Sequence, residues 1–157
     1  MTSVKECKSV DPLMDGEALG RIYVPGRVTW RAVLGCGLLI MALKVALATV
    51  GFSRTLRGVE VITKQRARPG RKDTDLIDRV AQAVATAAAL YPGRARCLEQ
   101  SLALYFCLRW LEVPIELRLG VQPYPFEAHS WVEHNGVPVY EDQELIKRFL
   151  PLPLVSQ

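Results

Sequence analysis

The strongest apolar run of the chain extends from Ala32 to Phe52 and predicts a helix. Lys44 is the only charged residue in the run, and arginines stand outside both of its ends at Arg27, Arg31, Arg54 and Arg57. The run is just long enough to span a bilayer, which requires about 20 apolar residues. A lysine near the middle of a span costs about 2.5 to 3.5 kcal/mol, so a buried or interfacial helix is the favoured interpretation.

A second, amphipathic helix is predicted from Ile77 to Tyr91, because apolar residues return there every three or four positions. The polar residues from Asp73 to Asp75 can cap its start, and Pro92-Gly93 ends it. The basic segment at residues 66–72 contains a Pro-Gly pair, which is typical of an exposed turn or linker. We therefore expect this segment to separate the first helix from the second.

A third helix is predicted to begin at Cys97 and to end near Val113-Pro114, and apolar residues cover most of its sides. After it, apolar and polar residues alternate from Ile115 to Gln122, which is the period of a half-buried strand. Asn135-Gly136 lies between two further strand-like segments and is a strong hairpin signal. The predicted fold class is α+β, with an antiparallel sheet packed on the helix that begins at Cys97.

The two ends of the chain carry weaker signals. Residues 1–30 mix charges, prolines and glycines, which predicts turns and one short strand from Arg21 to Pro25. Near the other end, residues from Glu144 to Phe149 predict a turn of helix.

Composition limits the class of protein. The chain has 157 residues, of which 50% are apolar and 23% charged, so a single folded domain is expected and a disordered chain is excluded. Lys and Arg number 20 and Asp and Glu number 16, and the resulting net charge of +4 is too small to indicate a nucleic-acid partner.

The four cysteines show no C-x-x-C spacing, and Lys5, Glu6 and Asp11 interrupt the position of an export signal. We therefore expect free thiols and a cytoplasmic location. The chain has only two histidines and no glycine-rich phosphate-binding motif, so neither a metal site nor a cofactor is expected.

Cys97 is the first candidate for chemistry, because it stands where a turn leads into a helix. Backbone N–H groups and the positive end of the helix dipole favour a thiolate at such a position, and Arg94 and Arg96 add positive charge. The same N–H groups could bind the oxyanion of a tetrahedral intermediate. The alternative interpretation is a buried cysteine that only fills space.

His129 favours the chemical interpretation. Strand alternation places His129 on one face with Trp131 and Glu133, while Ser130, Val132 and His134 take the other. A thiol at a helix start and an imidazole on a neighbouring strand form the usual arrangement of a thiol hydrolase. His134, beside the hairpin turn, is expected to be solvated. Cys107 lies about 15 Å along the helix from Cys97 and is expected to belong to the core.

A third group is needed to orient the imidazole, and Glu141 and Asp142 are the candidates. A two-residue Asn-Gly turn places Asp142 opposite His129 in the hairpin. A three-residue turn shifts the pairing by one residue and places Glu141 there instead. Both registers are compatible with the sequence, as is a solvated strand end. Gln100, one turn after Cys97, could support the oxyanion or could serve only in packing.

Four segments of the chain resemble the leader peptidases of lasso-peptide biosynthesis, which are bacterial cysteine proteases with a papain/transglutaminase-like core. The segments are Cys97-Leu-Glu-Gln-Ser-Leu-Ala-Leu, Leu119-Gly-Val, Pro125-Phe-Glu-Ala-His-Ser-Trp-Val-Glu133 and Gly136 onward. The similarity covers residues from about Asp75 to Asp142. It implies a core over residues 73–157, preceded by an N-terminal region of residues 1–72 that holds the apolar helix.

The resemblance also implies function. It suggests a catalytic triad in which Cys97 is the nucleophile and His129 the base, and the position of the family's Asp falls on Glu141, next to Asp142. The implied activity is removal of the leader from a lasso-peptide precursor. The implied partners are that precursor, a separate leader-binding protein and an ATP-dependent lasso cyclase, and the apolar helix is the candidate to dock the leader-binding protein or to contact a membrane.

Two other functions are compatible with the same residues. One is a non-catalytic scaffold, peptide-binding or membrane-associated, that keeps the fold. The other is a Cys-His acyltransferase of the transglutaminase type, which passes the acyl group to an amine instead of water. An intact thiol and imidazole argue against the scaffold, because a protein that only binds peptides needs neither.

Overall fold

The structure, a computed structural model, describes residues 28–64, 74–91 and 97–153. The predicted strand at residues 21–25, the linker at 66–72, Pro92-Gly93 and the two arginines before Cys97 lie outside the described residues, as does Cys7.

The apolar run predicted as one helix forms most of α1 (Trp30–Thr49), and a second helix, α2 (Phe52–Lys64), follows it. The predicted end of the helix at Phe52 is therefore wrong. Gly51 has a φ of 81°, a left-handed conformation that suits glycine, and the chain turns there. By length and composition α1 could cross a membrane, but the residues spaced three and four apart on one of its faces are buried in the core: Val33, Cys36, Ile40 and Leu43.

The two other predicted helices are confirmed as α3 (Thr74–Leu90) and α4 (Cys97–Trp110). Asp75 lies in the first turn of α3, where a negative charge is favoured by the helix dipole. Leu102, Ala103 and Leu108 of α4 are fully buried, in agreement with the wide apolar coverage of this helix. Beyond α4, Glu112 has a φ of 64° and turns the chain toward the sheet.

The sheet is antiparallel and has the strand order β3-β2-β1-β4. Its strands are β1 (Glu116–Pro123), β2 (Phe126–His134), β3 (Val137–Pro138) and β4 (Leu150–Leu152). A short helix, α5 (Gln143–Ile146), connects β3 to β4. The sequence did not predict β4, which contains Pro151, and its place at the edge of the sheet is one where a proline is tolerated.

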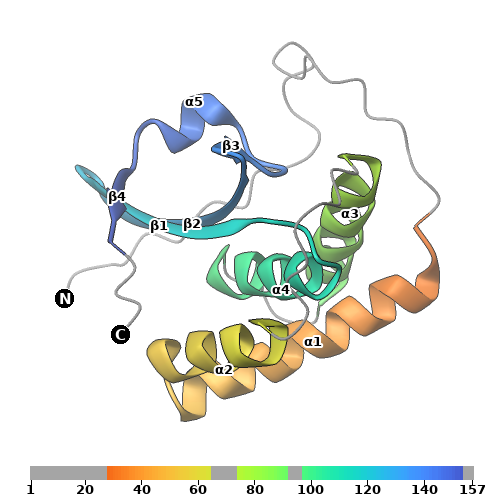
Figure 1. Cartoon of the computed structure of the whole chain (residues 1–157). Helices are drawn as coiled ribbons and strands as arrows, with labels where there is room; N and C mark the ends of the chain where they lie inside the picture. Colours follow the sequence, from red (N-terminus) through yellow and green to blue (C-terminus); the bar gives the residue numbers. More distant parts are fainter. Residues whose placement is uncertain (1–27, 65–73, 92–96, 154–157) are drawn as a thin grey trace.

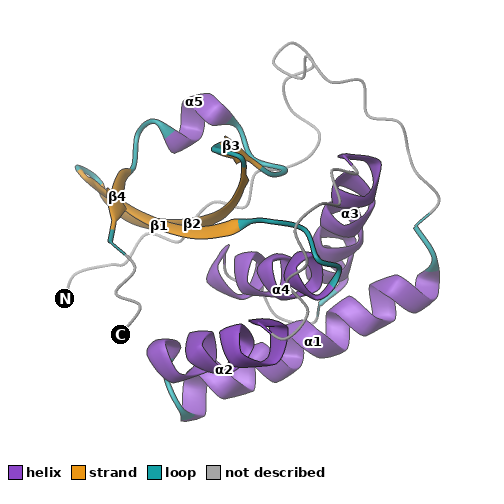
Figure 2. Ribbon diagram, in the orientation of Figure 1, coloured by secondary structure: helices purple, strands orange, loops and turns teal. Residues whose placement is uncertain are grey.

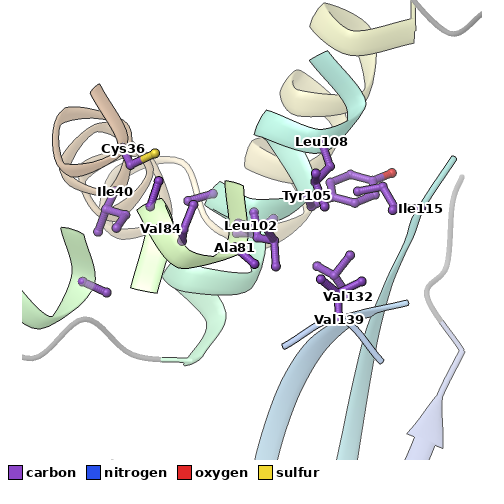
Figure 3. Packing of buried hydrophobic residues seen from close by; sticks show 14 of the residues in the cluster. Cys36, Ile40, Ala81, Val84, Leu102, Tyr105, Leu108, Ile115, Val132 and Val139 are labelled. Carbon is purple, nitrogen blue, oxygen red and sulfur yellow. The ribbon is translucent and has the colours of Figure 1, made fainter. Parts of the chain in front are cut away.

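The elements are stacked in layers (Figures 1 and 2). The sheet lies between α5 on one side and α4 on the other, and α1 and α2 form the outer layer beyond α4. One apolar core joins α1, α3 and α4 to β1 and β2, so it crosses the boundary expected near residue 72. Figure 3 shows Ile40, Val84, Leu102 and Val132 contributing to this core from four different elements.

The hairpin has a two-residue turn. Asn135 and Gly136 have φ angles of 52° and 75°, and His134 pairs with Val137, so the paired positions follow the two-residue register. The ladder ends soon afterwards, with the N–H of Val139 donating to the carbonyl of Val132 at 2.8 Å. Tyr140 then has a φ of 60°, and the chain leaves the strand direction before residues 141 and 142.

Candidate active site

Cys97 is the first residue of α4, as the sequence predicts, and it is half-buried. Its thiol interacts with the His129 ring and with the backbone and side chain of Ser130. The start of α4 and the strand β2 thus bring together a thiol and an imidazole that are far apart in the chain.

The environment of Cys97 favours the thiolate. Burial raises the pKa of the thiol, but the hydrogen bond and the positive charge of His129, with the hydrogen bonds from Ser130, outweigh burial. The net pKa of Cys97 is therefore lower than that of an ordinary cysteine. Low pKa values at a helix start beside a cationic histidine are characteristic of reactive cysteines.

His129 lies on β2, and its Nε2 is 3.3 Å from Oε1 of Glu141. Nε2 is buried and makes no well-aligned hydrogen bond among the described residues, so this approach is a charge contact. Burial lowers the pKa of His129, but Cys97 and Glu141 together raise it to about 9. Because Nε2 faces Glu141, Nδ1 is the ring nitrogen available to the sulfur of Cys97.

The two acidic candidates have different contacts. Glu141 approaches His129, whereas Asp142 is the N-cap of α5 and accepts a hydrogen bond from the N–H of Glu144 at 2.9 Å. The three-residue turn, which would select Glu141, is not formed, because the turn has two residues. Glu141 nevertheless reaches the imidazole, because the backbone turns at Tyr140 and the strand register no longer applies.

Aromatic rings pack around the imidazole. The Trp131 ring stacks on it with centroids 6.2 Å apart, and the Phe149 ring lies at 5.3 Å. The indole N–H of Trp131 donates to Glu133 at 2.8 Å, so His129, Trp131 and Glu133 share one face of β2 as alternation predicts. These contacts fix the ring plane of the candidate base.

Ser130 and Ser101 were not identified from the sequence. The Ser101 hydroxyl donates to the carbonyl of Ser130 at 2.7 Å, and the two hydroxyls lie 3.3 Å apart. Both side chains are buried, and the pair ties the first turns of α4 to β2 beside Cys97. The spacing of Ser101 four residues after Cys97, on the same helical face, was the available signal.

The remaining candidates lie near the site or away from it. Gln100 is half-buried in the first turn of α4, and its support of an oxyanion stays a prediction. The Cys107 thiol interacts with Cys36 of α1, and this contact and burial raise the pKa of Cys107. All three described cysteines are free thiols. His134 is partly exposed, and its Nδ1 also donates to the carbonyl of Pro114 at 2.7 Å.

In cysteine-type acyl transfer, a thiol is the nucleophile, an imidazole is the base and a third group such as a carboxylate orients the imidazole. Cys97, His129 and Glu141 contact one another in this order. A sequence model of the transglutaminase-like superfamily matches residues 38–153. The chain belongs to the transglutaminase-like superfamily. This superfamily includes cysteine peptidases and acyltransferases, and its fold agrees with the predicted α+β class. No curated protein and no solved structure matches the chain significantly.

Proposed function

We propose that this chain is a cysteine endopeptidase that removes the leader from a lasso-peptide precursor. The observation that carries the proposal is the contact of the Cys97 sulfur with the His129 imidazole, whose Nε2 lies 3.3 Å from Glu141. The resemblance of the segments around Cys97 and His129 to the lasso leader peptidases supports this choice within the superfamily.

In the first half of the reaction, the Cys97 thiolate attacks the carbonyl carbon of the scissile peptide bond. A C–S bond forms, and the carbonyl oxygen becomes an oxyanion that backbone N–H groups at the start of α4 can stabilise. The His129 imidazolium gives its proton to the leaving amine, the C–N bond breaks, and a thioester of Cys97 and the leader is left. The carboxylate of Glu141 stabilises the imidazolium before this transfer.

In the second half, water attacks the thioester carbonyl. His129, now neutral, takes a proton from the water, and the C–S bond breaks to release the leader with a free carboxylate. The Cys97 thiolate and the His129 imidazolium are restored together. The raised pKa of His129 and the lowered pKa of Cys97 favour this charged pair near neutral pH.

Recognition of the leader is proposed to come from a separate protein, working with the lasso cyclase in the cytoplasm. The described helices and sheet all fall to the proposed catalytic core, and the resemblance to the leader peptidases supports a separate leader-binding protein. The outer face of α1 is apolar and exposed, and we propose it as the docking surface for the leader-binding protein. Its large exposed side chains are Trp30, Leu34, Leu38, Met41 and Val45.

The test is cleavage of the precursor by Cys97→Ala and His129→Ala variants that fold normally. Both are expected to lose leader removal by several orders of magnitude, because each lacks a group that forms or resolves the thioester. Near wild-type cleavage by folded Cys97→Ala would refute the mechanism.

The same assay with an added primary amine separates hydrolysis from acyl transfer. Mass spectrometry should find the leader as a free acid, whereas a leader amide as the main product would make the chain an acyltransferase. A scaffold predicts a third result, in which the wild-type chain does not cleave and Cys97 does not react with iodoacetamide at neutral pH.

A further inference from the structure

A cavity of about 370 Å³ lies on the face of the sheet that carries His129. Residues of β1, β2, α5 and β4 contribute to it, so it is formed by tertiary packing and not by one loop. Its lining residues are Arg118, Trp131, Glu133, Ile146, Phe149 and Pro151.

The cavity adjoins the candidate base. Trp131 and Phe149 form part of its wall, and the rings of both also contact the His129 imidazole. Residues 129 and 131 are about 6.7 Å apart along an extended strand, which is also the spacing between same-side residues of an extended peptide. A peptide whose scissile bond lies at Cys97 and His129 can therefore direct a nearby side chain into the cavity.

The chemistry of the lining defines what the cavity accepts. Its two charged residues are already paired, with Nε of Arg118 at 3.1 Å from Oε2 of Glu133 and Nη2 of Arg118 at 2.6 Å from Glu116. The other oxygen of Glu133 accepts the indole hydrogen bond of Trp131. Because the two charged lining residues, Arg118 and Glu133, pair with each other and the other four lining residues are apolar, an uncharged apolar side chain is favoured over a charged one.

We propose that this cavity is a specificity subsite that binds an apolar side chain of the peptide substrate, one or two residues from the scissile bond. The proposal rests on the proposed peptidase function for the identity of the ligand as a peptide. Ile146 and Phe149 determine the size of the side chain that fits, and the paired Arg118 and Glu133 exclude an uncompensated charge.

The test uses synthetic precursor peptides with Ala, Leu, Lys or Glu at each of the two positions on either side of the cleavage site. Two quantities are measured for each peptide: its cleavage rate and the concentration that halves the alkylation of Cys97 by iodoacetamide. At one position, Leu is expected to be preferred over Lys and Glu by about 10-fold or more in both quantities, as is common for apolar pockets.

Ile146→Trp should fill the cavity and remove the preference for Leu over Ala at that position, while Ile146→Ala should shift the preference toward larger side chains. Leu150→Trp is the matched control, because Leu150 lies on β4 beside the cavity but is 61% exposed and is not part of the lining. Alkylation of Cys97 without peptide should be equal in all three variants.

The outcomes separate the two proposals. Protection of Cys97 that prefers apolar peptides without any cleavage would refute the peptidase and keep the subsite. Cleavage with no apolar preference at any of the four positions, or a preference that neither Ile146 variant changes, would refute the subsite.

Discussion

Gly120 lies directly opposite His129 in the pairing of β1 with β2, and the space that a side chain at Gly120 would fill is occupied by Trp131 and Phe149. A Cβ added to Gly120 would be 2.8 Å from Cβ of Phe149 and 2.9 Å from two ring carbons of Trp131. Both aromatic rings contact the imidazole. Because Gly120 has no side chain, Trp131 and Phe149 can occupy this space, and their rings hold the His129 imidazole in its position on β2.

The first prediction is that Gly120→Ala reduces kcat by about 10-fold or more, because the displaced rings move His129 away from Cys97. Overpacking of this kind costs about 1 to 3 kcal/mol of stability, so thermal unfolding must be measured beside activity. Gly58→Ala in α2 is the control, since its Cβ meets nothing within 4 Å and alanine favours the helix. A folded Gly120→Ala enzyme with an unchanged kcat would show that this packing does not position the base.

The second prediction separates the two neighbouring acids. Glu141→Ala should lower the cleavage rate by at least about 10²-fold, with the roughly 10⁴-fold effect of the acid in the Ser-His-Asp triad as the upper expectation. Asp142→Ala should instead lower the free energy of unfolding by about 1 kcal/mol, because it removes the N-cap of α5. A larger loss of turnover in Asp142→Ala than in Glu141→Ala would reverse the assignment.

The third prediction concerns pH. The thiolate–imidazolium pair exists above the lowered pKa of Cys97 and below the pKa of His129, which is about 9, so kcat/KM should fall as the pH rises through about 9. Because Glu141 raises the pKa of His129, Glu141→Gln should move this alkaline limb to lower pH. An alkaline limb at the same pH in the wild-type and Gln enzymes would exclude Glu141 as the partner of His129.

The fourth prediction compares the two buried serines. Ser130→Ala removes a side chain that lowers the pKa of Cys97 and should therefore raise the pKa of that thiol, which is measured as the pH dependence of alkylation. Ser101→Ala removes the bond to the Ser130 carbonyl and should lower stability by about 1 kcal/mol, with little change in the pKa. Peptide mapping must assign the label to Cys97, because Cys36 and Cys107 are also free. Equal pKa values in Ser130→Ala and Ser101→Ala would show that the Ser130 hydroxyl does not stabilise the thiolate.

The fifth prediction is that the leader-binding protein accelerates cleavage by about 10²-fold at low precursor concentration and much less at saturation, because it raises the local concentration of the scissile bond. Leu38→Glu on α1 should remove this acceleration without changing the rate of the chain alone. Leu90→Glu on α3 is the control, since Leu38 and Leu90 are similarly exposed, at 68% and 60%.

Two results would count against docking on α1. One is an equal rate at low precursor with and without the leader-binding protein. The other is that Leu38→Glu leaves the acceleration intact but abolishes binding to anionic lipid vesicles, which would identify α1 as a membrane-binding surface.

Elements with a clear period could be predicted from the sequence. The alternation from Ile115 to Gln122 and the Asn135-Gly136 turn correspond to β1 and the hairpin, and the apolar coverage after Cys97 corresponds to α4. The helix α2 was missed although Phe52, Thr55, Leu56, Val59 and Thr63 follow a helical spacing. Its start at Phe52 depends on the left-handed backbone of Gly51 just before it, and the continuous apolar run conceals this turn.

The surroundings of the candidate base were harder to predict. The contact of Glu141 with His129 depends on the backbone at Tyr140, which no short-range rule of strand pairing describes. The hydrogen bond of Ser101 to Ser130 joins residues 29 positions apart, and its existence depends on how α4 packs on β2. Such contacts arise from tertiary packing, and periodicity alone contains no information about them.

The outer face of α1 also affects how the isolated protein behaves in solution. Leu34 and Leu38 are 66% and 68% exposed, and side chains of this kind lower the free energy when they meet another apolar surface. In a concentrated preparation the nearest such surface belongs to another molecule of the same chain. Light scattering should therefore report an average mass that rises with protein concentration, and co-expression with a protein that covers α1 should improve the yield of soluble material.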